Sequence, residues 1–180
     1  MGAPHNKERY GETWPQERLD ETLQALVPLR TSITLSGGWA WHFMSPEGHP
    51  EYKHAHDHKD VDMFVHPTDT GMFLGMLSSQ GFLRVPTRYD SAKKDFMRYE
   101  KTTCVAGCGK SFKITLDVFL KSVPFRVVRD QWRVVEPKHL LSLYDSVHTS
   151  GECFAVTAAK KLMAEGIDPV GNELLVKIPV

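Results

Sequence analysis

The sequence predicts a single domain of the α/β (α+β) class. Its 180 residues are enough to enclose one well-buried core. Segments in which apolar residues have helical spacing occur among segments with strand spacing along the chain. The hydrophobic fraction of 41% and the charged fraction of 24% are ordinary for a soluble globular protein and favour that class.

The net charge and the apolar runs of the sequence bear on the expected location of the protein and on its classes of partner. The formal net charge is zero, which gives no global electrostatic reason to expect a nucleic-acid or membrane partner. No apolar run approaches the roughly 20 residues of a membrane span. Residues 1–17 are polar and lack the apolar core of a signal peptide, and three cysteines do not suggest a disulfide scaffold. We therefore expect a cytoplasmic protein without a membrane partner.

The first half of the chain is expected to alternate helix and strand. Residues 1–15 have no clear period and are predicted to form a loose N-terminal arm. A helix over 16–29 is indicated by an apolar stripe at Leu19, Leu23, Leu26 and Val27. A strand at 33–35, a helix over 39–44, a loop over 45–59 and a strand over 60–65 are predicted to follow.

The second half is expected to contain strands and then helices. A helix over 68–79 precedes strands at 82–85, 96–103 and 111–121, the last two joined across the glycines of 105–109. A short strand at 132–135 is followed by helices over 137–147 and 150–165 and an extended piece at 174–178. We take 1–180 as one domain, in which 124–180 is a mainly helical C-terminal part without an assigned role.

Two acids in one strand are the first candidate for chemistry. Successive side chains of a strand alternate between faces, so Asp60 and Asp62 project on the same side while Val61 and Met63 face the core. Two carboxylates on one face are unfavourable unless something positive lies between them, and a divalent cation prefers such oxygen ligands. The alternative is a solvated strand face that happens to carry two acids.

Two further segments suit the same chemistry. Ser36, Gly37 and Gly38 lie between a predicted strand and a predicted helix, where glycines and helix N–H groups suit a phosphate, although such turns are common. Asp117 is a lone acid in an apolar strand, on the face of Lys113, Thr115 and Phe119. It either faces water or, beside the first acidic strand, completes a three-carboxylate site able to hold two metal ions.

These motifs resemble those of the polymerase-β-type nucleotidyltransferase superfamily. The sequence Ser36-Gly37-Gly38-Trp39-Ala40, followed by His58-x-Asp60-x-Asp62, looks most like the aminoglycoside and lincosamide nucleotidyltransferases, over about residues 31–119. The resemblance implies a small mixed β-sheet with helices packed on it. It also implies that Ser36, Gly37 and Gly38, with His58, bind the nucleotide, and that Asp60 and Asp62 bind Mg²⁺ or Mn²⁺. Asp117 would be a third metal ligand or the base that deprotonates the acceptor.

The activity implied by this resemblance is transfer of a nucleoside monophosphate from an NTP to a hydroxyl acceptor, with release of pyrophosphate. The absence of net charge favours a small-molecule or protein acceptor over a long nucleic acid. The base of the NTP is not predicted.

Two alternatives remain open from the residues. The connection over 45–57 is longer than in those enzymes, with Lys53 its only basic residue apart from histidines, which suits an inactive binding or regulatory module. His54, His56 and His58 alternate and would share a face, which suits a metal-dependent hydrolase that also uses Asp60. A basic cluster of Lys93, Lys94 and Arg98 would either meet a triphosphate or form a solvated edge.

Overall fold

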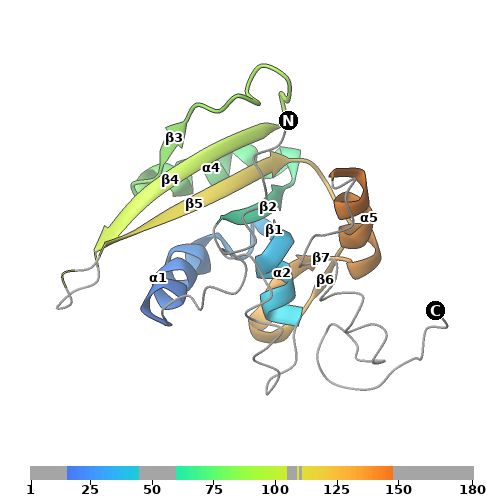
Figure 1. The fold of residues 1–180 in the computed structure, drawn as a ribbon, viewed down its shortest axis with the longest axis horizontal. Helices are drawn as coiled ribbons and strands as arrows, with labels where there is room; N and C mark the ends of the chain where they lie inside the picture. The colour runs from blue at the N-terminus through green and yellow to red at the C-terminus, as the bar shows by residue number, and fades with distance from the viewer. Residues whose placement is uncertain (1–15, 45–59, 105–108, 110, 148–180) are drawn as a thin grey trace.

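A computed structural model describes residues 16–44, 60–104, 109 and 111–147 (Figure 1). The predicted N-terminal arm, the loop over 45–59 with His54, His56 and His58, and the predicted elements at 150–165 and 174–178 lie outside the described residues. Most of the glycine-containing turn between the strands at 96–103 and 111–121 does so as well.

The described strands form one mixed sheet, as expected. Its order is β3-β4-β5-β2-β1-β7-β6, with β2–β5 and β1–β7 parallel and the other pairs antiparallel. The short strand β2 is at the centre of the sheet, with the long β4–β5 hairpin on one side of it and β1 on the other (Figure 1). The strand bounds are β1 Ile33–Leu35, β2 Val61–Val65, β3 Leu83–Val85, β4 Phe96–Cys104, β5 Ser111–Leu120, β6 Phe125–Val127 and β7 Arg133–Val135.

The described helices lie close to their predicted positions. They are α1 (Gln16–Leu26), α2 (Gly37–Met44), α4 (Thr70–Ser79) and α5 (Pro137–Val147). Short 3₁₀ turns continue α1 (η2, Val27–Leu29), precede α4 (η3, Pro67–Asp69) and precede β7 (η4, Arg129–Gln131). Within the ranges given above, no helix combines the length and apolar character needed to cross a bilayer.

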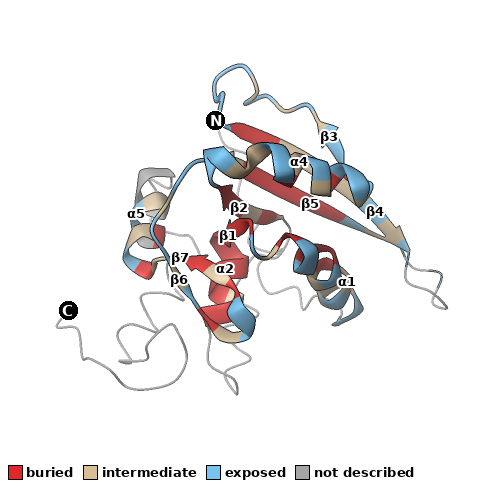
Figure 2. Ribbon diagram, turned by 180° about the vertical axis from the view of Figure 1, so that it is seen from behind, coloured by how far each residue is buried: buried red, intermediate tan, exposed pale blue. Residues whose placement is uncertain are grey.

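The core combines one face of the sheet with residues of α1, α2 and α4, and α4 covers β4 and β5 on that side (Figure 2). Val61 and Met63 of β2 are 1% and 0% exposed, so they face this core as predicted. Leu116 and Val118 of β5 join them there with Phe73 of α4. The alternate residues of β2 and β5 therefore point to the opposite face, which we call the acidic face because Asp62 and Asp117 lie on it.

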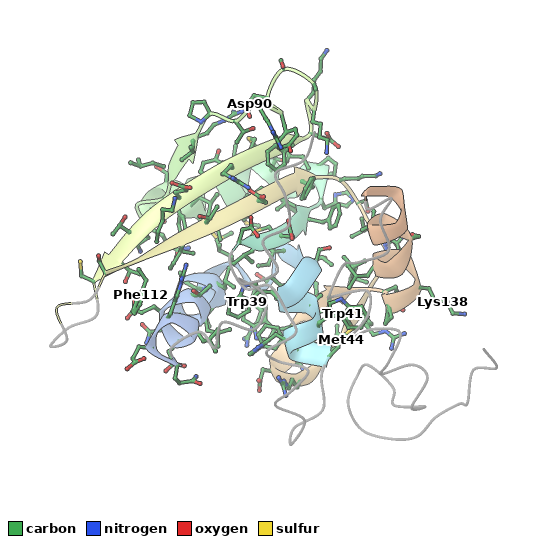
Figure 3. The ribbon with its side chains drawn as sticks, in the orientation of Figure 1. Trp39, Trp41, Met44, Asp90, Phe112 and Lys138 are labelled. Carbon is green, nitrogen blue, oxygen red and sulfur yellow. The ribbon has the colours of Figure 1, made fainter. Side chains whose placement is uncertain are left out.

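Helix α2 is buried on nearly every side. Trp39, Trp41 and Met44 are each 0% exposed (Figure 3), as is expected of a helix that is apolar all round. The β6–β7 region holds it in place, since Phe43 stacks on Trp132 with 4.9 Å between ring centroids. The start of α2 is thus a firmly packed end of the acidic face.

Two details differ from expectation. Val27, assigned to the apolar stripe, is 52% exposed, because the chain tightens into η2 at this residue and Leu29, 0% exposed, takes the buried position instead. The strand β6 was not predicted, and 124–147 contributes a β6–β7 hairpin to the sheet before α5, so this part is less helical than expected. Three residues are too few for alternation to identify such an edge strand.

Candidate active site

The pairing of β2 with β5 brings the predicted acids together. Asp62 and Asp117 are direct partners in the parallel register, so both side chains project from the acidic face. Asp117 is buried, at 7% exposed, although it belongs to a polar residue type. Asp60 lies at the bend just before β2. Its Oδ2 is 3.5 Å from Nη2 of Arg98, the arginine that also forms an ion pair with Asp117. The expectation that Asp117 lies beside the first acidic strand is therefore confirmed.

The glycine segment meets Asp62 directly. The N–H of Ser36 donates to the backbone carbonyl of Asp62 over 2.8 Å. Gly37 has a φ of +57°, and a Cβ built on it would lie 2.4 Å from Asp62 Oδ2. Only glycine combines this left-handed backbone with such close approach to a carboxylate. Glycine at position 37 thus allows the start of α2 to lie directly against the carboxylate of Asp62.

Arg98 lies among the acids, and the sequence did not indicate its pairing with Asp117. It is the cross-strand partner of Asp117, and its Nε and Nη2 donate to Asp117 Oδ1 and Oδ2 over 2.6 Å each. These hydrogen bonds raise the pKa of Arg98 against the opposing effect of burial, and the charges of Asp117 and Asp60 add to the rise. For this member of the basic cluster the solvated edge is wrong, because Arg98 forms an ion pair within the acidic face, and the triphosphate contact stays a prediction.

The carboxylates fit a divalent cation in part. Asp60 and Asp62 offer the hard oxygen ligands that Mg²⁺ and Mn²⁺ prefer. Asp117 fits less well, because each of its oxygens already accepts a hydrogen bond from Arg98, which would compete with a metal ion. Within the described ranges no three His, Cys, Asp or Glu side chains are gathered as a metal site. The metal-binding roles of Asp60 and Asp62 stay predictions, and so does the nucleotide role of His58, which is outside the described residues.

A cavity of about 480 Å³ opens beside these groups. This volume lies within the roughly 300–1,000 Å³ range of small-molecule sites. Ser36, Gly37 and Asp62 line one end, and Leu140 and Leu143 of α5 contribute apolar surface. The remaining lining combines aromatic rings with charged groups: Phe64, Phe119, Lys93, Asp95 and Lys121. The two phenylalanine rings are 5.3 Å apart between centroids and tilted by 32° to each other, and they add apolar surface to the lining.

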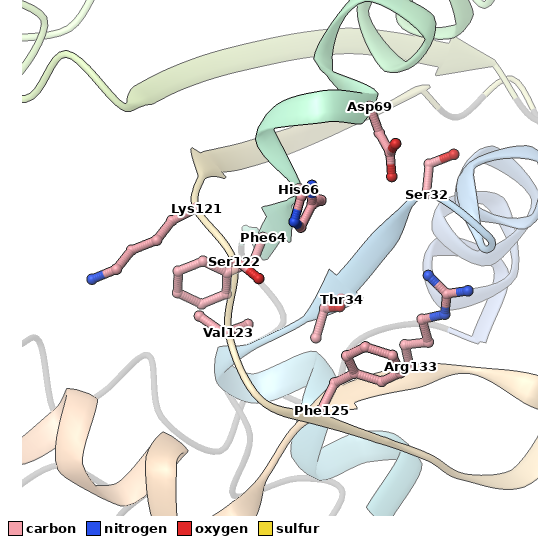
Figure 4. A pocket seen from close by; sticks show the side chains of 10 residues that line it. All are labelled: Ser32, Thr34, Phe64, His66, Asp69, Lys121, Ser122, Val123, Phe125 and Arg133. Atoms are coloured by element: carbon pink, nitrogen blue, oxygen red, sulfur yellow. The ribbon is translucent and has the colours of Figure 1, made fainter.

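A smaller cavity of about 190 Å³ shares Phe64 and Lys121 with the larger one (Figure 4). Its lining is rich in hydrogen-bonding groups, which come from β1, from the segment after β2 and from β7. Ser32 Oγ is buried there without a hydrogen-bond partner in the described part of the chain. Arg133 packs over the ring of Phe125, at 5.1 Å from its centroid. The Lys121 side chain extends away from the other labelled groups (Figure 4). No local sequence pattern indicated this cavity.

Comparisons with known proteins bear on the fold. Neither a protein-family model nor a curated protein sequence matches the chain. The solved structure of JHP933 from Helicobacter pylori aligns with a TM-score of 0.56 at 15% identity, over 84% of this chain and 69% of that one. A protein from H. pylori proposed to be a nucleotidyltransferase aligns with a TM-score of 0.50 at 15% identity, over 77% of this chain and 62% of that one, less than two thirds of its length.

A third solved structure, that of the antibiotic-resistance factor ANT(2'')-Ia, aligns with a TM-score of 0.47 at 14% identity, over 86% of this chain and 85% of that one. At such identities structural likeness shows the fold alone. The mixed sheet and the order of its elements agree with the resemblance carried by the glycine and aspartate motifs. The chain therefore has a nucleotidyltransferase-like fold of the α/β (α+β) class.

Proposed function

We propose that this protein transfers a nucleoside monophosphate from an NTP to a hydroxyl acceptor, with a divalent cation, Mg²⁺ or Mn²⁺, bound by Asp60 and Asp62. The observation that carries the proposal is the contact between the Gly37 backbone and the Asp62 carboxylate at one end of the larger cavity. Nucleotidyl transfer needs a phosphate-binding backbone and a cation-binding acid within one small space. The glycine makes this possible because it has no Cβ.

The larger cavity suits the donor nucleotide. Ser36 and Gly37 lie at the end next to Asp62, where the phosphates would be held. Lys93 and Lys121 line the same cavity and would offset the negative charge of the triphosphate. The rings of Phe64 and Phe119, which both line this cavity, offer aromatic surface against which a base would pack. A bound divalent cation would neutralise charge that develops on the phosphate and the leaving pyrophosphate.

The smaller cavity suits a polar acceptor group. It adjoins the donor cavity at Phe64 and Lys121, and its lining includes Ser32, whose buried hydroxyl has no described partner. A volume of about 190 Å³ is below the usual range of small-molecule pockets, so it would hold one small part of an acceptor. A small molecule or a protein side chain fits this description better than a long nucleic acid.

A second candidate function is a binding or regulatory module on the same fold. The observation that favours it is the ion pair of Arg98 with Asp117, which leaves the third carboxylate occupied. Such a module would still bind an NTP with the cation in the larger cavity but would release no pyrophosphate. The predicted histidine-loop hydrolase rests on His54, His56 and His58, outside the described residues, and stays an alternative that a zinc measurement would decide.

The first test is thermal unfolding of the full chain with Mg²⁺ and each of the four NTPs. A ligand at 100 times its dissociation constant adds roughly 2.7 kcal/mol to the free energy of unfolding, which corresponds to about 5–10 °C in Tm for a chain of this size. We expect a metal-dependent rise with at least one NTP for the wild type and none for Asp62→Asn. Asp20→Asn, which changes an exposed acid of α1, is the matched control and should keep the rise.

Two outcomes would contradict the proposal. One is a Tm that no NTP raises in the presence of metal, and the other is a rise that Asp62→Asn retains in full. Pyrophosphate release, followed with candidate acceptors bearing hydroxyl groups, then separates the transferase from the binding module. Release by the wild type and not by Asp62→Asn supports the transferase, whereas binding without release supports the module.

A further inference from the structure

The acidic face already holds one cation. Asp60, Asp62 and Asp117 carry three formal negative charges, and Arg98 brings one positive charge into contact with two of these acids. Its guanidinium lies 2.6 Å from Asp117 Oδ2 and 3.5 Å from Asp60 Oδ2. Among the described residues, Arg98 is therefore a positively charged group that already lies against these acids, in the place where a metal ion would otherwise be expected.

The guanidinium of Arg98 is held in position by its hydrogen bonds to Asp117. Both oxygens of Asp117 accept from it, in the two-pronged arrangement that a planar guanidinium makes with a carboxylate. The side chain of Asp117 is 11% exposed and that of Arg98 is 31% exposed. A metal ion that bound Asp117 would compete with a partly buried guanidinium for the same carboxylate, and breaking such a pair is unfavourable. Strand pairing also keeps the two residues opposite each other.

We propose that Arg98 takes the place of a second metal ion, so that the chain binds a single divalent cation on Asp60 and Asp62. Asp117 is then a positioning residue that holds Arg98, and it is not a metal ligand. The inference rests on the proposed function, which supplies the divalent cation. It departs from the three-carboxylate site for two metal ions that the sequence suggested, and from the metal-ligand role that the family resemblance allows for Asp117. Lys93 and Lys121 in the larger cavity would meet the remaining charge of a triphosphate.

The test is a titration of the full chain with Mn²⁺ alone, in which electron paramagnetic resonance reports free Mn²⁺. We expect one bound ion per chain for the wild type. Asp117→Asn should keep that ion, with an affinity loss no greater than the about 10- to 100-fold that residues outside the direct ligand set cost. Arg98→Gln should bind a second ion, because Asp117 becomes available. Arg84→Gln, which removes a more exposed paired arginine of β3, is the matched control and should match the wild type.

The outcomes separate this inference from the proposed function. Two ions bound by the wild type, or loss of the ion in Asp117→Asn, would overturn the inference and leave the transferase proposal in place. A single ion in Arg98→Gln would also overturn it. No Mn²⁺ bound by the wild type would overturn both. If Arg98→Gln does not fold, the wild type and Asp117→Asn still decide, since a metal-ligand role of Asp117 predicts that Asp117→Asn loses the ion whereas the inference predicts that it is kept.

Discussion

Alanine at position 37 should damage the site through two separate effects. The φ of Gly37 is +57°, and a residue with a Cβ pays about 1–2 kcal/mol to adopt this left-handed backbone. The added Cβ would also lie 2.4 Å from Asp62 Oδ2 and 3.3 Å from its Cγ, well inside van der Waals contact. Relief requires movement of the Asp62 carboxylate or of the start of α2. We therefore expect Gly37→Ala to lose stability and to displace the acid on which the proposed cation site depends.

Gly81→Ala separates the two effects. Gly81 has a φ of +80°, and a Cβ at this position would have no heavy atom within 4 Å beyond its chain neighbours, so only the backbone cost applies there. That cost of about 1–2 kcal/mol corresponds to a Tm lower by about 2–8 °C in a chain of this size. Gly37→Ala should lower the free energy of unfolding by more than Gly81→Ala. The excess reports the contact with Asp62.

Urea unfolding and Mn²⁺ binding together measure the prediction. Gly81→Ala should bind Mn²⁺ as the wild type does, because it lies far from the acids along the chain and touches none of them. Gly37→Ala should lose most of its affinity even at temperatures where it remains folded. Equal destabilisation by the two substitutions, with wild-type Mn²⁺ affinity in both, would refute the argument that Gly37 exists to admit the carboxylate.

Three other substitutions test the packing and one surface charge. Phe73→Ala, at a residue that is 0% exposed, should lower the free energy of unfolding by about 3–5 kcal/mol in urea titrations. Gly75→Ala, in α4 with nothing within 4 Å of the new Cβ, should raise it by about 0.5–1 kcal/mol. Hydrogen bonds from Thr87 hold the pKa of Asp90 below its ordinary value of 3.8. The ionised Asp90 therefore stabilises the fold above that pH and loses this effect as the pH falls through its lowered pKa. Asp90→Asn should lower the urea midpoint at pH 7 and have little effect in strong acid, and an equal effect at both pH values would contradict the assignment.

Local spacing in the sequence was enough to predict much of the described structure. Alternation over 111–121 predicted β5 and placed Asp117 opposite the core residues, because side chains in a strand change face at every residue. The same rule assigned Val61 and Met63 to the core and Asp62 to the other face. Helical spacing predicted α1 and α4. These features depend on neighbours within a few residues, which is why they can be read without the fold.

Strand pairing was not accessible in the same way. Arg98 and Asp117 lie 19 residues apart, and a register slipped by one residue would send Arg98 to the core face. Residues 105–110 join the two strands, and their sequence does not determine the register. The basic cluster around Arg98 was therefore expected to meet a triphosphate or to form a solvated edge, and its pairing with Asp117 was not predicted. The same holds for the two cavities, whose linings combine side chains from β1, β2, β5 and β7 with others from the loops between strands or from α5.

By itself the sequence determined the fold class, the face on which each acid lies and the glycine segment that meets the acids. Its motifs also pointed to the nucleotidyltransferase-like fold. Only the tertiary structure decided that Asp62 and Asp117 are partners, that Arg98 binds Asp117, and that a cavity opens beside Gly37. The physical reason is the distance along the chain over which each feature depends on other residues. Periodicity reflects the local geometry of one strand or helix, whereas the charge balance of a site depends on which distant strands pair and in which register.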